Sequence, residues 1–250
     1  MSANFAGTLP SREVCEKIAD QTEGVTLLAF SRGKDSLASW LYLRQFFDTI
    51  IPYTCIHIPG LEFVERSLKY YEDWFETKIH RVLYTNVGND IAWKYFQLPG
   101  DYEHIDRTEF IDYPMTYLEN LLMQHHGLDF EDYWTAHGFS RYDSLDRQGW
   151  VKKCGGIHKK TNRFFPCWDW KPTEIRSFIE QQQPKISLPE DYLFTNRSLE
   201  ATPGWKNLRI MRETHPEDYR RCEFWFPLIG AQVARQVFRE AHFAGDNNDD

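Results

Sequence analysis

The sequence predicts an α/β fold, a doubly wound and mostly parallel sheet flanked by helices, with a helical C-terminal extension. Short apolar runs alternate with amphipathic stretches over the first 83 residues, which is typical of strand–helix–strand units joined by right-handed crossovers. The runs at 25–30 and 50–58 are apolar throughout, as in strands that are buried on both faces. A small-residue loop, SRGKDS, separates the first run from the amphipathic stretch that follows it.

Periodicity and turn residues assign each element along the chain. The expected strands are 25–30, 50–58, 79–83 and 133–136, and 151–165 is expected to be a basic hairpin or long turn. The expected helices are 10–21, 37–47, 61–75, 114–125, one capped by Thr173, 205–212, one after Pro216, and 228–243. Residues 86–113 are expected to be a loop-rich insert. We expect an α/β domain over 1–183, a mainly helical extension over 184–244 and a frayed tail over 245–250.

Composition narrows the class of protein. The 250 residues carry a formal net charge of −8, so the chain is not a general polyanion binder, although a local basic patch can still hold a nucleic acid. Five cysteines form no C-x-x-C pair, which indicates reduced thiols rather than a disulfide framework or a thiol metal centre. The sequence shows no signal peptide and no apolar run long enough to span a bilayer. We therefore expect a cytoplasmic protein that does not contact a membrane.

The SRGKDS loop is placed to bind phosphate. A loop between a buried strand and the start of a helix points backbone amides and the positive end of the helix dipole at an anion. Small residues let the backbone come close, and Lys34 adds a cation for the charge that develops in a reaction. Arg32 is either a second cation for the phosphates or a residue that changes the path of the loop.

The same loop resembles the PP-loop, S-G-G-x-D-S, of the N-type ATP pyrophosphatases, in the adenine nucleotide alpha hydrolase-like superfamily. Ser31, Gly33, Asp35 and Ser36 match this motif, and Arg32 stands where a glycine is usual. Three later segments, HIPGLEF at 57–63, GFSRYDSLDR at 138–147 and PCWDWKPTEI at 166–175, resemble segments of the phosphoadenosine phosphosulfate (PAPS) reductase branch and occur in the same order. The matching residues in them are Gly60, Glu62, Phe63, Gly138, Asp143, Ser144, Arg147, Asp169 and Trp170. Two departures are His57, near a usual aspartate, and Ser140, at a usual arginine.

The resemblance implies a nucleotide site at the C-terminal ends of the strands. It gives Lys34 and Asp35 catalytic roles and makes Asp35 a ligand for Mg²⁺. The implied phosphate-binding residues are Ser31, Arg32, Gly33, Lys34, Ser36, Gly138, Ser144 and Arg147. The implied adenosine pocket is Phe30, His57, Pro59 and Gly60, and the candidates for the second substrate are Arg141, Asp143, Lys159 and Lys160. The implied cofactors are ATP, or PAPS, and Mg²⁺.

Three functions remain open from the sequence. In the first, the protein cleaves ATP between the α- and β-phosphates and adenylylates an acceptor, such as a nucleotide or a nucleic acid held by the basic hairpin. In the second, it is a sulfonucleotide reductase or sulfurtransferase that borrows a thiol from a protein partner. This chain lacks the E-C-G-[IL]-H motif of PAPS reductases and the clustered cysteines of its iron–sulfur relatives, so no iron–sulfur cluster is expected. In the third, it is a non-catalytic nucleotide-binding subunit.

Overall fold

The chain divides into two compact units in the computed structural model. The structure describes residues 9–56, 58–83, 114–129, 132–142, 148–149, 153–188, 204–225 and 229–243. The first unit comprises Met1–Cys55, Leu68–Val82 and Pro114–Tyr192. The second comprises Ile56–Ser67, Leu83–Tyr113 and Leu193–Asp250. The insert expected over 86–113 and the tail expected over 245–250 lie outside the described residues.

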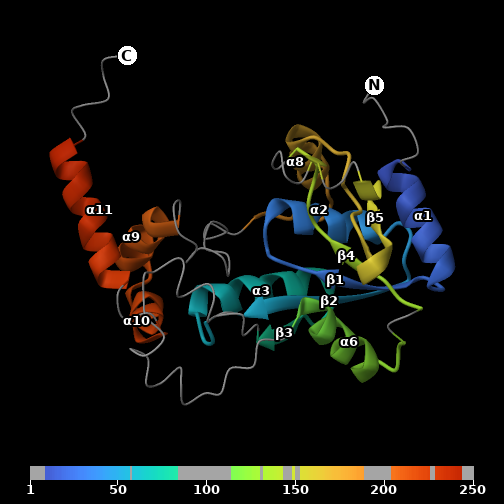
Figure 1. Cartoon of the computed structure of the whole chain (residues 1–250), viewed down its shortest axis with the longest axis horizontal. Coiled ribbons are helices and arrows are strands. Elements are labelled where there is room, and N and C mark those ends of the chain that lie inside the picture. Colours follow the sequence, from blue (N-terminus) through green and yellow to red (C-terminus); the bar gives the residue numbers. More distant parts are fainter. Residues whose placement is uncertain are drawn as a thin grey trace. The chain divides into compact units, whose positions relative to one another are not determined.

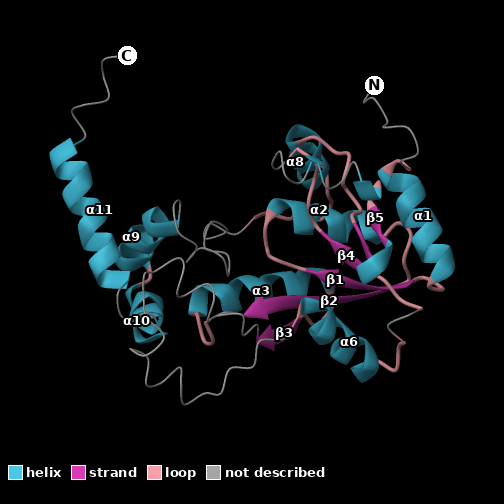
Figure 2. Ribbon diagram, viewed as in Figure 1, coloured by secondary structure: helices cyan, strands magenta, loops and turns pink. Residues whose placement is uncertain are grey.

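A mostly parallel six-stranded sheet confirms the α/β fold. Its strands are β1 (Val25–Ala29), β2 (Thr49–Ile56), β3 (His80–Leu83), β4 (Thr135–His137), β5 (Ile157–His158) and β6 (Arg163–Phe164). They lie in the order β3-β2-β1-β4-β6-β5. The central strand β1 pairs in parallel with both β2 and β4, and β4 pairs in parallel with β6. The chain thus builds outward from β1 to β3 and then returns to the other side of β1, which makes the sheet doubly wound (Figures 1 and 2).

Helices cover both faces of this sheet. On one face, α2 (Lys34–Leu43) contacts α8 (Pro172–Glu180), and Trp40 of α2 stacks on Phe75 of α3 (Glu62–Phe75) with ring centroids 3.8 Å apart. The helix α6 (Met115–His125) covers the other face (Figure 1). There it joins a buried apolar cluster made by Leu27, Ile51, Tyr53, Leu122 and Met123. Successive strand residues point to opposite sides of a sheet, so strands that are apolar throughout give it two apolar faces.

Several expected boundaries shift. The first strand ends at Ala29, and α2 ends at Leu43 rather than at residue 47. The fourth strand runs from Thr135 to His137 rather than over 133–136. The prediction that Thr173 caps α8 is wrong. The helix begins at Pro172, and the Lys171 amide donates to Glu174 at 2.6 Å. Proline suits the first helical position because its missing N–H has no partner there in any case.

The basic hairpin is confirmed. The strands β5 and β6 are antiparallel, and the 3-10 turn Lys159–Thr161 joins them.

The helix α1 (Ser11–Gln21) precedes β1, and its first residue, Ser11, donates hydrogen bonds from both its amide and its hydroxyl to the carboxylate of Asp169. Asp169 therefore satisfies the N-terminus of α1, which Pro10 leaves without a side-chain cap.

The second unit contains, among its described residues, three whole helices and the start of α3 (62–67). The whole helices are α9 (Gly204–Thr214), α10 (Pro216–Trp225) and α11 (Ile229–Phe243). Their shared core includes Leu208, Met211, Tyr219, Cys222, Ile229 and Val233. Within the part of the chain that the structure describes, no helix combines the length and the apolar character needed to cross a membrane.

Candidate functional site

The loop after β1 ends directly on the first turn of α2. Gly33 is the residue before the helix, Lys34 is its first residue, and the first helical hydrogen bond runs from the Leu37 amide to the Gly33 carbonyl at 3.0 Å. The amides of residues 34–36 precede that bond, and helix geometry gives them no carbonyl partner within the helix. The positive end of the α2 dipole adds to their partial charges. This turn therefore has the features that bind an anion.

Arg32 adopts the backbone conformation of a glycine. Its φ is +65°, in the left-handed region that costs an L residue about 1–2 kcal/mol. The PP-loop motif has glycine at this position, which enters the region without that cost. Arg32 therefore has a backbone conformation that a glycine would adopt more easily, and its side chain is 1% exposed.

The two serines of the loop hold its shape. The buried Ser36 hydroxyl donates to the Gly33 carbonyl at 3.0 Å and accepts the Ser31 amide at 3.2 Å. The two hydroxyl oxygens lie 3.1 Å apart. Ser36 therefore closes the loop on itself, whereas Ser31 is exposed and can meet a ligand.

Lys34 and Asp35 form an ion pair. The ammonium nitrogen lies 2.6 Å from Oδ1 of Asp35, and the two side chains are 25% and 22% exposed. Both groups therefore reach solvent at the start of α2. A phosphate would compete with Asp35 for the ammonium, and a cation would compete with Lys34 for the carboxylate.

The loop after β4 lies on the loop after β1. A Cβ added at Gly138 would meet the Cα of Ser36 and would lie 2.6 Å from the Ser36 nitrogen and 2.8 Å from the carbonyl carbon of Asp35. These atoms are all backbone, so only glycine allows the approach. The strands β1 and β4 are also the point at which the strand order reverses. Open α/β sheets bind ligands at such a point, outside the carboxyl ends of the strands.

The Gly138 loop is held by hydrogen bonds to the segment 166–170. The Arg141 amide donates to the Trp168 carbonyl at 2.9 Å, and the Ser140 hydroxyl donates to the Trp170 carbonyl at 2.6 Å. The buried Arg141 guanidinium lies over the rings of Tyr142 and Trp168, at 4.9 and 5.5 Å from their centroids. Arg141 thus helps to hold the loop in place, and its role toward a second substrate stays a prediction.

A buried polar network centred on Glu119 lies on the α6 side of the sheet, and no pattern in the sequence predicted it. The carboxylate of Glu119, on α6, accepts the Tyr53 hydroxyl at 2.7 Å and the Arg163 guanidinium at 2.8 Å. It also lies 3.0 Å from Nε2 of His137, the residue before Gly138. Burial raises the pKa of Glu119, but the contacts with His137 and Arg163 outweigh it and hold the pKa below its ordinary value. The network fixes the end of β4 and takes Arg163 out of the basic hairpin surface.

The remaining predicted residues fall into four groups. Phe30 has a buried ring packed edge-on against Trp40 and Tyr71, and its amide donates to the Tyr53 carbonyl at 2.7 Å, so the residue belongs to the core. Lys159 and Lys160 are exposed at the hairpin turn. Pro59 and Gly60 are exposed and belong to the second unit. His57, Asp143, Ser144 and Arg147 lie outside the described residues.

Four of the five cysteines show no sign of activation. Cys15, Cys167 and Cys222 are buried, and burial raises the pKa of each thiol, to about 12 for Cys222. Burial also raises the pKa of the half-buried Cys154. A nucleophilic cysteine needs the opposite shift. Among the described residues, no group of three or more His, Cys, Asp and Glu side chains is arranged to hold a metal.

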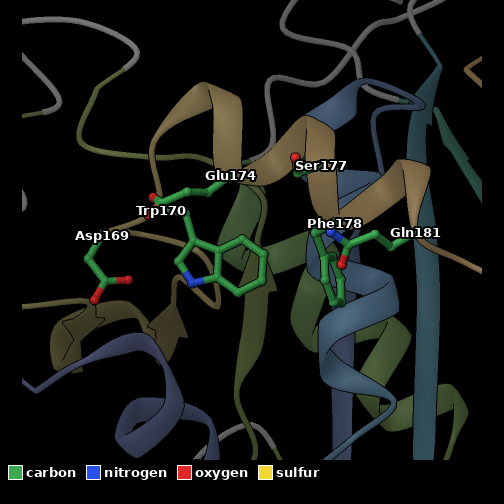
Figure 3. A pocket seen from close by; sticks show the side chains of 6 residues that line it. All are labelled: Asp169, Trp170, Glu174, Ser177, Phe178 and Gln181. Atoms are coloured by element: carbon green, nitrogen blue, oxygen red, sulfur yellow. The ribbon is translucent and has the colours of Figure 1, made fainter.

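A separate pocket of about 470 Å³ lies beside α8 (Figure 3). It is lined by Asp169, Trp170, Glu174, Ser177, Phe178 and Gln181. The rings of Trp170 and Phe178 contact Tyr42, in the last turn of α2. The pocket is therefore distinct from the anion-binding turn, which lies at the other end of that helix.

Comparison with known proteins adds little to this geometry. No protein-family model matches the sequence, and no curated protein matches it. Two solved structures are similar: a predicted subunit of a tRNA methyltransferase from Methanocaldococcus jannaschii and an NH3-dependent NAD synthetase from Campylobacter jejuni. The first is 13% identical to this chain with a TM-score of 0.35, and the match covers 78% of this chain and 92% of the methyltransferase subunit. The second is 12% identical with a TM-score of 0.38, covering 92% and 96%. At such low scores, neither likeness bears on the function.

Proposed function

We propose that this protein binds ATP at the loop Ser31–Ser36, cleaves it between the α- and β-phosphates and transfers the adenylyl group to an acceptor. One observation supports the proposal most directly. The Gly138 loop lies on the backbone of Ser36 at the point where the strand order reverses, so two loops border the first turn of α2. A phosphate chain suits this place because amides, a helix dipole and cations converge on it.

Each loop residue has a role in this proposal. The first-turn amides and the exposed Ser31 hydroxyl donate to phosphate oxygens. Lys34 leaves Asp35 to neutralise charge on the departing pyrophosphate. An oxygen or nitrogen of the acceptor bonds to the α-phosphorus, the bond from that phosphorus to the bridging oxygen breaks, and pyrophosphate leaves with that oxygen. The protein then contributes positioning and charge stabilisation.

Asp35 fits a magnesium ion in this arrangement. Magnesium with a nucleotide usually takes one or two carboxylates, with phosphate oxygens and waters completing its shell. Asp35 offers one carboxylate that is partly exposed at the start of α2. The ion would supply positive charge to the phosphates, while Asp35 would fix where that charge lies.

The choice of ATP over PAPS rests on the thiols of this chain. Reduction of a sulfonucleotide needs a thiolate, and burial raises the pKa of Cys15, Cys154, Cys167 and Cys222. Such chemistry would then depend on a partner's thiol. Adenylylation asks for no thiol. The turn that carries Lys159 and Lys160 precedes β6, which is parallel to β4, so it lies at the amino ends of these strands, and an acceptor at the Ser31–Ser36 loop would be held by other residues.

Calorimetric titration of the full chain with ATP, with and without Mg²⁺, and with PAPS tests the proposal. We expect ATP to bind with a magnesium-dependent affinity and Lys34→Ala to weaken it at least tenfold. Lys69→Ala is the matched control, because Lys69 also pairs with an aspartate, Asp73, on an exposed helix face. Tight PAPS binding without magnesium, together with no ATP binding, would refute the proposal. Binding of ATP without pyrophosphate release, when candidate acceptors are added, would favour a non-catalytic subunit.

A further inference from the structure

Three histidines gather where the edge strand β3 meets the end of α6. His80 is the first residue of β3, and His125 and His126 end α6. The Nε2 atoms of His80 and His126 lie 3.0 Å apart. The ring centroid of His125 is 5.4 Å from that of His126 and 6.2 Å from that of His80. All three belong to the first unit, and the proposed nucleotide site uses none of them.

The distance between the two nitrogens matches that of two ligands on one metal ion. Metal–nitrogen bonds of about 2.0–2.1 Å that meet at a right or tetrahedral angle separate the nitrogens by about 2.9–3.4 Å. Without a metal, one Nε2 must donate a proton to the other. A metal bound by both nitrogens would lie beside the line that joins them, because two bonds of about 2.0–2.1 Å do not fit end to end within 3.0 Å. The donor ring can move its proton to its own Nδ1, and both rings would turn to point their Nε2 atoms at the ion without moving apart.

We propose that His80 and His126 form a binding site for a divalent transition metal of the zinc, nickel or copper type. Imidazole nitrogen is a preferred ligand of these ions, whereas Mg²⁺ prefers oxygen. Two protein ligands leave the remaining positions to water. Such an ion would fasten the edge strand β3 to α6.

The surroundings allow an ion to enter. His126 is exposed and His80 is half-buried, so the pair faces solvent on one side. Lys78 and Arg81 are the nearby cations, and Arg81 is paired with Glu72.

Calorimetry of the full chain, stripped with a chelator and titrated with ZnCl₂, NiCl₂ or MgCl₂, tests the site. We expect one zinc or nickel ion per chain at this site and no response to magnesium. His126→Ala should weaken the binding at least tenfold, because even residues that only support metal ligands contribute tenfold or more. The matched control is His125→Ala, which removes the adjacent exposed imidazole and should leave the affinity within about twofold, since the proposal gives it no bond to the metal.

Thermal unfolding gives a second measurement. Zinc should raise the unfolding midpoint of the wild type and of His125→Ala, and should leave that of His126→Ala unchanged, because a ligand stabilises only the state that it binds. Absence of zinc and nickel binding in the wild type, or full binding in His126→Ala, would overturn the proposal. Equal weakening by His125→Ala and His126→Ala would overturn the assignment to this pair.

Discussion

Gly138 lies against the backbone of Ser36 so closely that no side chain fits between them. The contact joins the loop after β4 to the first turn of α2, and it is made of backbone on both sides. Because backbone atoms cannot rotate away as a side chain can, the separation of the two loops is fixed. The width of the proposed phosphate site therefore depends on this glycine.

Replacing Gly138 by alanine should displace one loop from the other. The new Cβ would lie 2.6 Å from the Ser36 nitrogen, so the structure must shift, at a cost of about 1–3 kcal/mol typical of overpacking. We expect a lower free energy of unfolding and loss of ATP binding by calorimetry. Gly149→Ala is the control, because a Cβ there meets nothing within 4 Å. Unchanged ATP affinity in Gly138→Ala would show that the two loops do not form one site.

Arg32 combines a strained backbone with a buried cation, and substitution can separate the two. Arg32→Gly relieves the left-handed φ of +65° but removes the guanidinium, whereas Arg32→Lys keeps a charge at the same backbone cost. If Arg32 supports the phosphates, ATP affinity should fall at least tenfold in the glycine variant and less in the lysine variant. Equal affinity of the glycine variant and the wild type would assign Arg32 to folding alone.

Glu119 should be among the most sensitive positions for stability. Glu119→Gln leaves Arg163 without its carboxylate in a buried place, and breaking such a pair costs about 3–5 kcal/mol. Urea unfolding at pH 7 measures this loss. Glu16→Gln is the control. Glu16 also pairs with an arginine, Arg12, but this pair lies on an exposed helix face, where an ion pair contributes little to stability.

The same carboxylate predicts a dependence of stability on pH. Its folded pKa lies below the ordinary value of 4.5, so its contribution is complete above that value and is lost as the pH falls through the lower, folded pKa. The difference in unfolding free energy between wild type and Glu119→Gln should therefore be constant near neutrality and shrink below about pH 4.5. A difference that stays constant down to pH 3 would mean that Glu119 has the same pKa in the folded and unfolded chains, and a stability that rises as the pH falls towards 4.5 would mean that its folded pKa is raised.

Asp218 caps the start of α3 from a distant part of the chain. Its two carboxylate oxygens accept the amides of Glu62 and Phe63 at 2.8 and 3.0 Å, and Arg221 pairs with it at 3.0 Å. Asp218→Ala should cost about 1–2 kcal/mol, as loss of an N-cap does. Amide hydrogen exchange should speed up first at Glu62 and Phe63. Glu217→Ala, which alters only an exposed pair, should leave their exchange unchanged.

The sequence predicted the fold and the anion-binding turn because both have local patterns. Apolar runs mark the strands of a parallel sheet, and a motif of six adjacent residues marks the loop. The Glu119 network and the Asp218 cap have no such pattern. Glu119 lies 66 positions from Tyr53, and Asp218 lies 156 positions from Glu62. A buried glutamate on a helix cannot be told from an exposed one until the partners that neutralise it are placed, and Gly138 shows its steric role only once β4 lies beside β1.

The pairing of β1 with β4 also sets an order of events during synthesis. The Thr26 hydroxyl donates to the Trp134 carbonyl, 108 positions later, whereas β1, β2 and β3 all lie within the first 83 residues. On a ribosome adding about 5–20 residues per second, the first three strands emerge several seconds before the fourth. Until β4 is synthesised, only the loop after β1 borders the start of α2. The second loop is added when Gly138 is synthesised and β4 pairs with β1. A nascent chain that stalls before β4 would expose the free edge of β1 to other chains.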